Sequence, residues 1–242
     1  MSETKTTASP AFPPTRWSLV LAAREGSAPE MAAAFETVCV LYWQPLYAFV
    51  RRCGRTPHDA EDLTQGFFRS LLEKRWLEQA DQEKGRLRSF LILAMKRFMT
   101  NEGRNTAAQK RGGGEAHLPI DTAFAESYYR ADESERLVAD QVFDREWALT
   151  LLRLATQRLE AEFKDAAQFQ ALKGFLTAAH DEIDYNLAAA KLKTTVNAAR
   201  VAVHRFRKRF RAAYREEVAQ TLPPSADVEG EVRYLANVLA EN

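Results

Sequence analysis

The sequence predicts an all-α protein with two small helical domains joined by a flexible linker, the C-terminal one containing a helix–turn–helix. Three observations favour this class. The 242 residues include only 10 Gly and 9 Pro, which leaves room for long helices. Apolar residues recur at spacings of three and four along most of the chain. Three consecutive glycines at 112–114 interrupt that pattern near the middle, where we expect no helix to continue.

These patterns divide the chain into four parts. Residues 1–14 are a Ser/Thr/Pro tail that we expect to be disordered. Residues 15–108 form a first helical domain, and residues 109–133 form a polar, weakly patterned linker. Residues 134–242 form a second domain with the helix–turn–helix and an acidic C-terminal tail.

The first domain contains four predicted helices with apolar faces, at residues 15–24, 31–52, 57–76 and 86–103. Pro45 lies inside the second of them and predicts a kink or a break, because proline removes a hydrogen-bond donor and clashes with the preceding turn. Residues 78–85 form a polar loop.

In the second domain, a long amphipathic helix is expected over 134–162, and another helix contains Phe169 and Leu176. A short helix over 184–192 follows, and then a turn through Lys193 and Thr194. A long helix begins near Thr195, whose hydroxyl can accept from an unpaired N–H of the first turn. Prolines 223 and 224 close that helix, and 226–239 predicts a last acidic helix.

The long helix is apolar on one face and basic on the others. Its apolar positions are Val196, Ala199, Val203, Phe206, Phe210 and Ala213. No acidic residue occurs between Tyr185 and Arg215. A helix–turn–helix with so basic a second helix has the shape that enters the DNA major groove. A merely solvated face, a membrane-surface helix or a calmodulin target remain alternatives, but these need no preceding helix and turn.

The overall composition sets further limits. The net charge of +1 hides basic segments at 84–111 and 191–215 and acidic ones at 121–146 and 216–241. Cys39 and Cys53 lack C-x-x-C spacing and are expected to be small apolar side chains. There is no signal-peptide pattern and no apolar run near eighteen residues, so we expect a cytoplasmic protein that does not enter membranes.

A polar stripe marks the helix predicted over 57–76. Its members at helical spacing are His58, Asp62, Gln65 and Arg69, flanked by Asp59 and Glu61. Acids in a first turn favour the helix dipole, which is a sufficient structural reason for them. A metal or acid–base site is the other interpretation, but Asp59, Glu61 and Asp62 cannot converge on one ion from adjacent helical positions.

Three segments resemble a bacterial RNA polymerase sigma factor of the extracytoplasmic-function group. DAEDLTQGFF at 59–68 is similar to the stretch that docks on the clamp helices of the largest polymerase subunit. RLRSFLILAMKRFMTNE at 86–102 is similar to the helix that melts and reads the promoter −10 element. LAAAKLKTTVNAARVAVHRFRKRF at 187–210 looks like the helix–turn–helix that reads the −35 element.

The resemblance implies a non-enzymatic initiation factor without metal or cofactor, with a region 2-like domain followed by a region 4-like domain. Its partners would be core RNA polymerase, through the clamp helices and the flap, promoter DNA, and in some circumstances an anti-sigma factor. The polymerase-binding residues implied are Asp59, Glu61, Asp62, Gln65 and Arg69. Those implied for the −10 element are Arg86, Arg88, Lys96, Arg97, Thr100 and Arg104. For the −35 element they are Lys193, Thr195, Asn197, Arg200, His204, Arg205, Arg207, Lys208 and Arg211.

Within that last set, position along the helix suggests two roles. Thr195, Asn197, Arg200 and His204 lie near the end that enters the groove, where side chains reach base edges. The four basic residues of the set that follow along the helix are expected to contact phosphates; these are Arg205, Arg207, Lys208 and Arg211. The family often has Asn at the position of Arg97, Asp at that of Asn101 and Gly at the turn where Lys193 stands.

Two other functions remain open at this stage. A DNA-binding regulator that never touches polymerase would account for the last domain but leave the stripe of 59–68 without a role. A hydrolase could use His58, or His180 with Asp181 and Glu182. The sequence contains no nucleophile motif, phosphate-binding glycine loop or metal-ligand spacing for such an enzyme.

Overall fold

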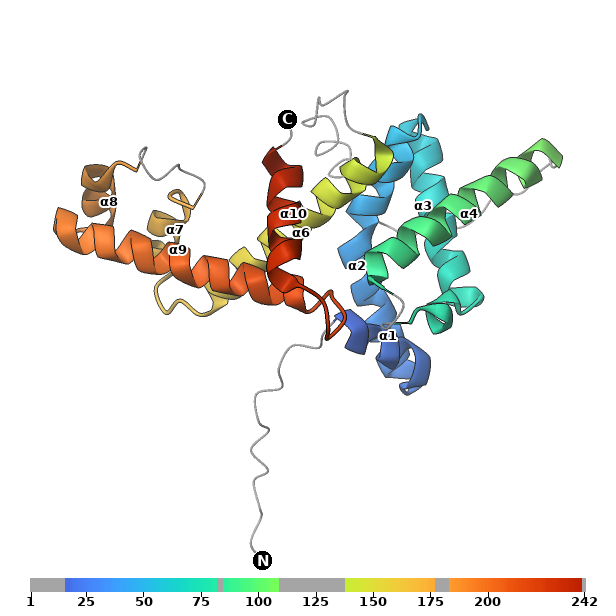
Figure 1. Cartoon of the computed structure of the whole chain (residues 1–242), viewed down its shortest axis with the longest axis horizontal. Helices are drawn as coiled ribbons and strands as arrows, with labels where there is room; N and C mark the ends of the chain where they lie inside the picture. The colour runs from blue at the N-terminus through green and yellow to red at the C-terminus, as the bar shows by residue number, and fades with distance from the viewer. Residues whose placement is uncertain (1–15, 82–84, 109–137, 177–182, 241–242) are drawn as a thin grey trace, which may run out of the picture. The chain divides into compact units, whose positions relative to one another are not determined.

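The computed structural model describes residues 16–81, 85–108, 138–176 and 183–240. This part of the chain consists of helices and turns without a strand (Figure 1), which confirms the all-α prediction. The tail expected at 1–14 and the linker expected at 109–133 lie outside the described residues. Contacts divide the chain into two compact units. Unit 1 comprises Met1–Trp147 and Gln220–Ala226, and unit 2 comprises Ala148–Ala219 and Asp227–Glu241.

Unit 1 is built from five elements and the first part of a sixth. These are α1 (Arg16–Glu25), α2 (Ala28–Arg52), α3 (Pro57–Glu73), the 3₁₀ helix η1 (Trp76–Gln79), α4 (Leu87–Ala108) and α6 (Ala139–Ala161) up to Trp147. Aromatic rings join three of them. Phe68 of α3 stacks on Trp43 of α2 with centroids 5.9 Å apart, and Phe67 meets Phe98 of α4 edge-on at 5.9 Å.

Helix α2 begins earlier than predicted and has no break. The Ser27 N–H donates to the Glu30 carboxylate at 2.8 Å, which forms a capping box and lowers the pKa of Glu30. The helix then continues through Pro45, so the expected break is wrong. Every residue from Leu41 to Val50 is buried, and this packing offsets the hydrogen bond that the proline removes.

Two further boundaries differ from the sequence-based expectation. Helix α4 continues past Gly103 to Ala108, and part of the loop expected over 78–85 is η1, with Leu77 buried. The first part of α6 belongs to unit 1, where Trp147 stacks on Tyr42 with centroids 4.5 Å apart. Apolar spacing reveals that a helix has a buried face, but not which core covers it.

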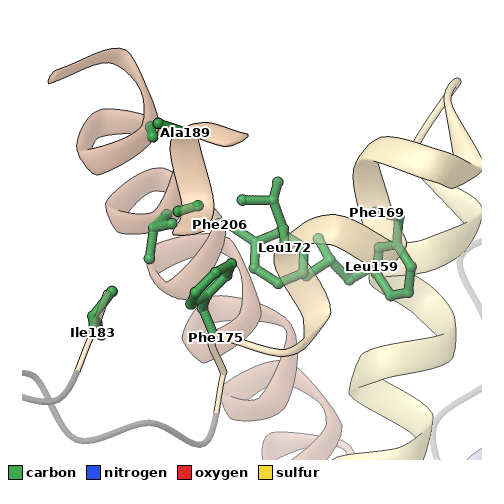
Figure 2. Packing of buried hydrophobic residues seen from close by; sticks show 10 residues of the cluster. Leu159, Phe169, Leu172, Phe175, Ile183, Ala189 and Phe206 are labelled. Atoms are coloured by element: carbon green, nitrogen blue, oxygen red, sulfur yellow. The ribbon is translucent and has the colours of Figure 1, made fainter. Parts of the chain in front are cut away.

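Unit 2 surrounds an aromatic cluster. Its helices are the remainder of α6, α7 (Ala166–Lys173), α8 (Tyr185–Leu192), α9 (Val196–Ala219) and α10 (Val228–Ala240). The rings of Phe163, Phe169 and Phe206 meet edge-on, with centroids 5.5–5.7 Å apart. Figure 2 shows side chains of α6, α7, α8 and α9 gathered in this cluster. The fully or nearly buried members are Leu159, Phe169, Leu172, Phe175, Ile183, Ala188, Ala189, Ala199, Val203 and Phe206.

Helix α10 packs on the C-terminal part of α9, near the range predicted for it. Leu235 and Val238 are buried, and Arg215 of α9 forms an ion pair with Glu229 of α10. Within the described residues, no helix combines the length and the apolar character needed to cross a membrane.

Removing the Phe206 ring is expected to destabilise unit 2 strongly. Phe206 is 2% exposed and lies between two other rings, so Phe206→Ala should lower the free energy of unfolding by about 3–5 kcal/mol. Tyr234→Ala is the matched control, because Tyr234 of α10 is 41% exposed and should cost at most about 0.5 kcal/mol. Guanidinium unfolding of the full chain followed by circular dichroism measures both. Similar losses for the two variants would contradict this description of the core.

Candidate nucleic-acid interface

Helices α8 and α9 form a helix–turn–helix whose ends are capped by side chains. Asp184 Oδ1 accepts from the N–H groups of Asn186 at 2.9 Å and Leu187 at 3.0 Å, which satisfies the start of α8. Thr195 Oγ1 accepts from the Ala198 N–H at 3.3 Å. This bond confirms Thr195 as the cap of α9. The connection between the two helices is three residues long, Lys193 to Thr195, and its last residue is the cap of α9.

The turn itself is a Schellman motif. The Thr194 N–H donates to the Ala189 carbonyl at 3.0 Å, and the Lys193 N–H donates to the Ala190 carbonyl at 3.3 Å. Lys193 has φ 51° and ψ 47°, the left-handed conformation that glycine usually supplies at this position. The lysine therefore adopts the backbone of the common glycine turn at a steric cost.

Helix α9 separates a buried face from an exposed one. Ala199, Val203, Phe206 and Ala213 are buried, as the apolar spacing predicted. Val196 is 38% exposed and Phe210 is half-buried, so the ends of the predicted face are less covered. The opposite face is defined here as the exposed stripe. It consists of Asn197, Arg200, Val201, His204, Lys208 and Arg211, all exposed.

The cations of α9 differ in how far they are already engaged. Arg209 pairs with Glu162 at 2.7 Å and lies over the Phe163 ring at 4.9 Å, so it holds α9 to the end of α6. Arg207 is half-buried, whereas Arg205 and Lys208 are exposed and pair with no carboxylate of the described residues. The Arg200 guanidinium lies over the Tyr185 ring of α8, 4.9 Å from its centroid. These contacts leave the exposed stripe available to phosphates and bases.

In unit 1, α4 presents only part of its predicted DNA-binding set. Arg88 was expected among the −10 contacts, but it is 5% exposed and forms an ion pair with Asp144, with 3.1 Å between Arg88 Nε and Asp144 Oδ1. It lies on the side of α4 that α6 covers, where it is not exposed for a contact with DNA. Lys96 Nζ, on the exposed side, is 2.8 Å from both carboxylate oxygens of Asp140.

Three other residues of the α4 set are exposed. Arg97 and Thr100 are exposed, and Arg86 is exposed just before the helix begins. The Thr100 hydroxyl donates to the Lys96 carbonyl at 2.9 Å. The side chain of Arg104, the last member of the set, lies outside the described residues.

The predicted polymerase-binding stripe of α3 is less exposed than the sequence suggested. Gln65 was expected to be exposed, yet it is 5% exposed, and its Nε2 donates to Glu61 Oε1 at 3.2 Å. Gln65 lies one turn before Phe68, which packs on Phe35 and Trp43, so α2 covers that side of α3. The carboxylate of Asp62 remains half exposed, 3.7 Å from His58.

Two other members of that stripe are Asp59 and Arg69. Thr56 Oγ1 accepts from the Asp59 N–H at 3.1 Å and donates to the Asp59 carboxylate at 2.7 Å, so Asp59 helps to cap α3. Arg69 is half-buried. The capping interaction keeps the Asp59 side chain exposed and fixed in direction.

No group of three or more His, Cys, Asp or Glu side chains in the described ranges could hold a metal ion. His180, Asp181 and Glu182 lie outside those ranges. Both cysteines are free, with Cys39 half-buried and Cys53 exposed. Burial raises the pKa of the Cys39 thiol to about 12, which keeps it protonated and unreactive at neutral pH.

No model of a protein family, no curated protein and no solved structure matches this chain. The geometry of the described residues therefore provides the structural basis for a functional proposal.

Sequence reasoning missed two kinds of residue at these surfaces. Asp140 and Asp144 of α6 engage Lys96 and Arg88, and nothing local in the sequence indicates those pairs. Val201 is 48% exposed in the exposed stripe. Its position four residues after Asn197, on the same face of the predicted helix, could have indicated from the sequence that Val201 is exposed.

Replacing Lys193 should relieve the strain in the turn. A left-handed conformation costs a residue with a Cβ about 1–2 kcal/mol, part of which glycine loses again through its greater freedom in the unfolded chain. Lys193→Gly should therefore raise the free energy of unfolding by about 0.5–1 kcal/mol. Lys193→Ala is the control, because it removes the same charge but keeps the strain. Equal stabilities of the two variants in chemical denaturation would argue against this account of the turn.

Proposed function

We propose that this chain is a bacterial RNA polymerase sigma factor of the extracytoplasmic-function group. It binds core RNA polymerase and directs transcription initiation, with α4 of unit 1 at the −10 element and α9 of unit 2 at the −35 element. The observation that carries the proposal is the exposed stripe of α9, set on a capped helix–turn–helix. The sequence resemblance of 59–68, 86–102 and 187–210 extends that observation to polymerase.

The stripe suits a DNA groove in both charge and position. The segment from Tyr185 to Arg215 contains no acid, so the field at this face attracts a polyanion. Asn197 and Arg200 lie within the first two turns of α9, and helix–turn–helix proteins contact base edges with this end of the second helix. Arg205, Lys208 and Arg211 follow, where phosphate contacts are expected.

The polymerase-binding half of the function is assigned to the exposed acids of α3. Asp62 offers a half-exposed carboxylate on the side away from Phe67, and Asp59 is exposed at the start of the helix. A basic helix of a partner could donate to both. Since α3 is fixed to α2 and α4 by Phe67 and Phe68, these acids are presented on a rigid support.

One observation favours a second candidate, a helix–turn–helix regulator that acts without core polymerase. Gln65 is buried and bonded to Glu61, so the stripe offers fewer groups to a partner than the sequence suggested. A regulator would need only unit 2 for its DNA contacts. Binding of the purified chain to core polymerase separates the two candidates.

Removing the Asp62 carboxylate should weaken binding to core polymerase. Because charged pairs buried at an interface are costly to break, Asp62→Asn should reduce affinity by about tenfold or more, with unchanged helicity. Glu36→Gln is the control, since Glu36 is an exposed acid on α2 outside the stripe. Titration of labelled core enzyme gives both affinities. If Asp62→Asn and Glu36→Gln bind like the parent chain, the Asp62 side of α3 is only a solvated surface.

Within α9, residues near the start of the helix should contact bases, and residues further along should contact phosphates. Arg200 lies near the start of the helix, and a bidentate arginine–guanine pair contributes about 1–3 kcal/mol of discrimination. Arg200→Ala should therefore lose activity unequally across a panel of −35 variants. Arg211 lies three turns further along, so Arg211→Ala should weaken all variants alike and reduce the salt slope by about one phosphate contact.

Transcription across the −35 panel at several salt concentrations measures both effects. Arg211→Ala serves as the matched control for Arg200→Ala, because both remove an exposed arginine from the same helix. Equal, sequence-independent losses would show that Arg200 does not read a base.

A further inference from the structure

We infer that Val201 recognises thymine, by packing its side chain against the C5-methyl group of one thymine in the major groove. Resting on the DNA-binding function proposed above, this inference assigns a sequence-determining role to a residue outside the predicted contact set. It also specifies the chemical group that is read, a methyl group rather than a hydrogen-bonding edge.

The position of Val201 is the first observation. It follows Asn197 by four residues and precedes His204 by three, so the three side chains share one face of α9. The buried residues Ala199 and Val203 flank it in sequence and point to the opposite side. Its rise above the capping Thr195 is about 9 Å, six residues at 1.5 Å each, within the part of a recognition helix that meets base edges.

The chemistry of Val201 is the second observation. Within the described residues of α9, it is the one branched aliphatic side chain in the exposed stripe, and it is 48% exposed. Single exposed apolar residues are common on protein surfaces, so exposure alone would mean little. Here every neighbour in the stripe is polar or charged, and a β-branched residue lowers helix propensity. The hydrophobic core cluster of unit 2 does not include this side chain.

The major groove offers a matching apolar group. Thymine alone among the four bases presents a methyl group there, and small apolar side chains contact it. The flanking Asn197 and Arg200 can bond adenine and guanine edges, which would place Val201 between polar contacts on neighbouring base pairs. Closing the contact removes water from both methyl-bearing groups, which favours binding.

The test uses uracil, which differs from thymine by that methyl group alone. Duplexes bound by the full chain are first selected from random sequences, with the chain alone and with core RNA polymerase. Each thymine of the selected −35 sequence is then replaced singly by deoxyuridine, and affinities are measured in the mixture that gave the selection. One replacement should weaken binding of the parent chain about fourfold, the effect expected for losing one buried methyl-sized group.

Variants link that loss to Val201. Val201→Ala, which loses both γ-methyl groups and reaches less far into the groove, should lose most of the preference for thymine over uracil at the sensitive position, whereas Val201→Thr, which keeps one γ-methyl group, should retain more of it. Val40→Ala is the control, because it makes the same change at an exposed valine of α2 and should preserve the full preference. Since Val201 is exposed, none of these changes removes core packing.

The outcomes separate the inference from the function on which it rests. Sequences that are selected but show no uracil sensitivity, or a sensitivity that survives undiminished in Val201→Ala, overturn the role of Val201 and leave DNA binding intact. Failure to select any sequence, with or without core polymerase, overturns both.

Discussion

Packing of Phe206 against Phe163 and Phe169 fixes the rotation of α9, and the position of the exposed stripe depends on that rotation. Side chains on a helix keep constant angular relations, so burial of Ala199, Val203 and Phe206 dictates which residues are exposed. The exposed stripe is thus a consequence of core packing. Arg209 reinforces the same rotation through its ion pair with Glu162. Its charge is therefore already neutralised within unit 2.

The helix–turn–helix was predictable from sequence because its signals are local. Asp184 and Thr195 mark the starts of the two helices, and the apolar spacing from Ala199 to Phe206 marks the buried face. The position of the turn can also be read from the sequence, because Lys193 lies between two segments with a helical pattern. That Lys193 takes the left-handed conformation itself could not be read from its side chain, which normally disfavours it.

The exposure predicted from the sequence was wrong for residues whose environment depends on a distant segment of the chain. Arg88 and Gln65 lie at the edges of amphipathic faces, and only the placement of α6 and α2 decides that both are buried. The Lys96–Asp140 pair joins residues 44 positions apart in the sequence. The sequence likewise does not show that residues 139–147 group with unit 1.

The central claim is that this chain gives core polymerase its promoter preference. Run-off transcription with purified core enzyme on genomic fragments tests it most directly. The account predicts discrete transcripts that require the chain and whose start sites share two sequence elements. Fragments that the chain binds without any change in the transcripts made by core polymerase would contradict it, and would identify a regulator that acts by DNA binding alone.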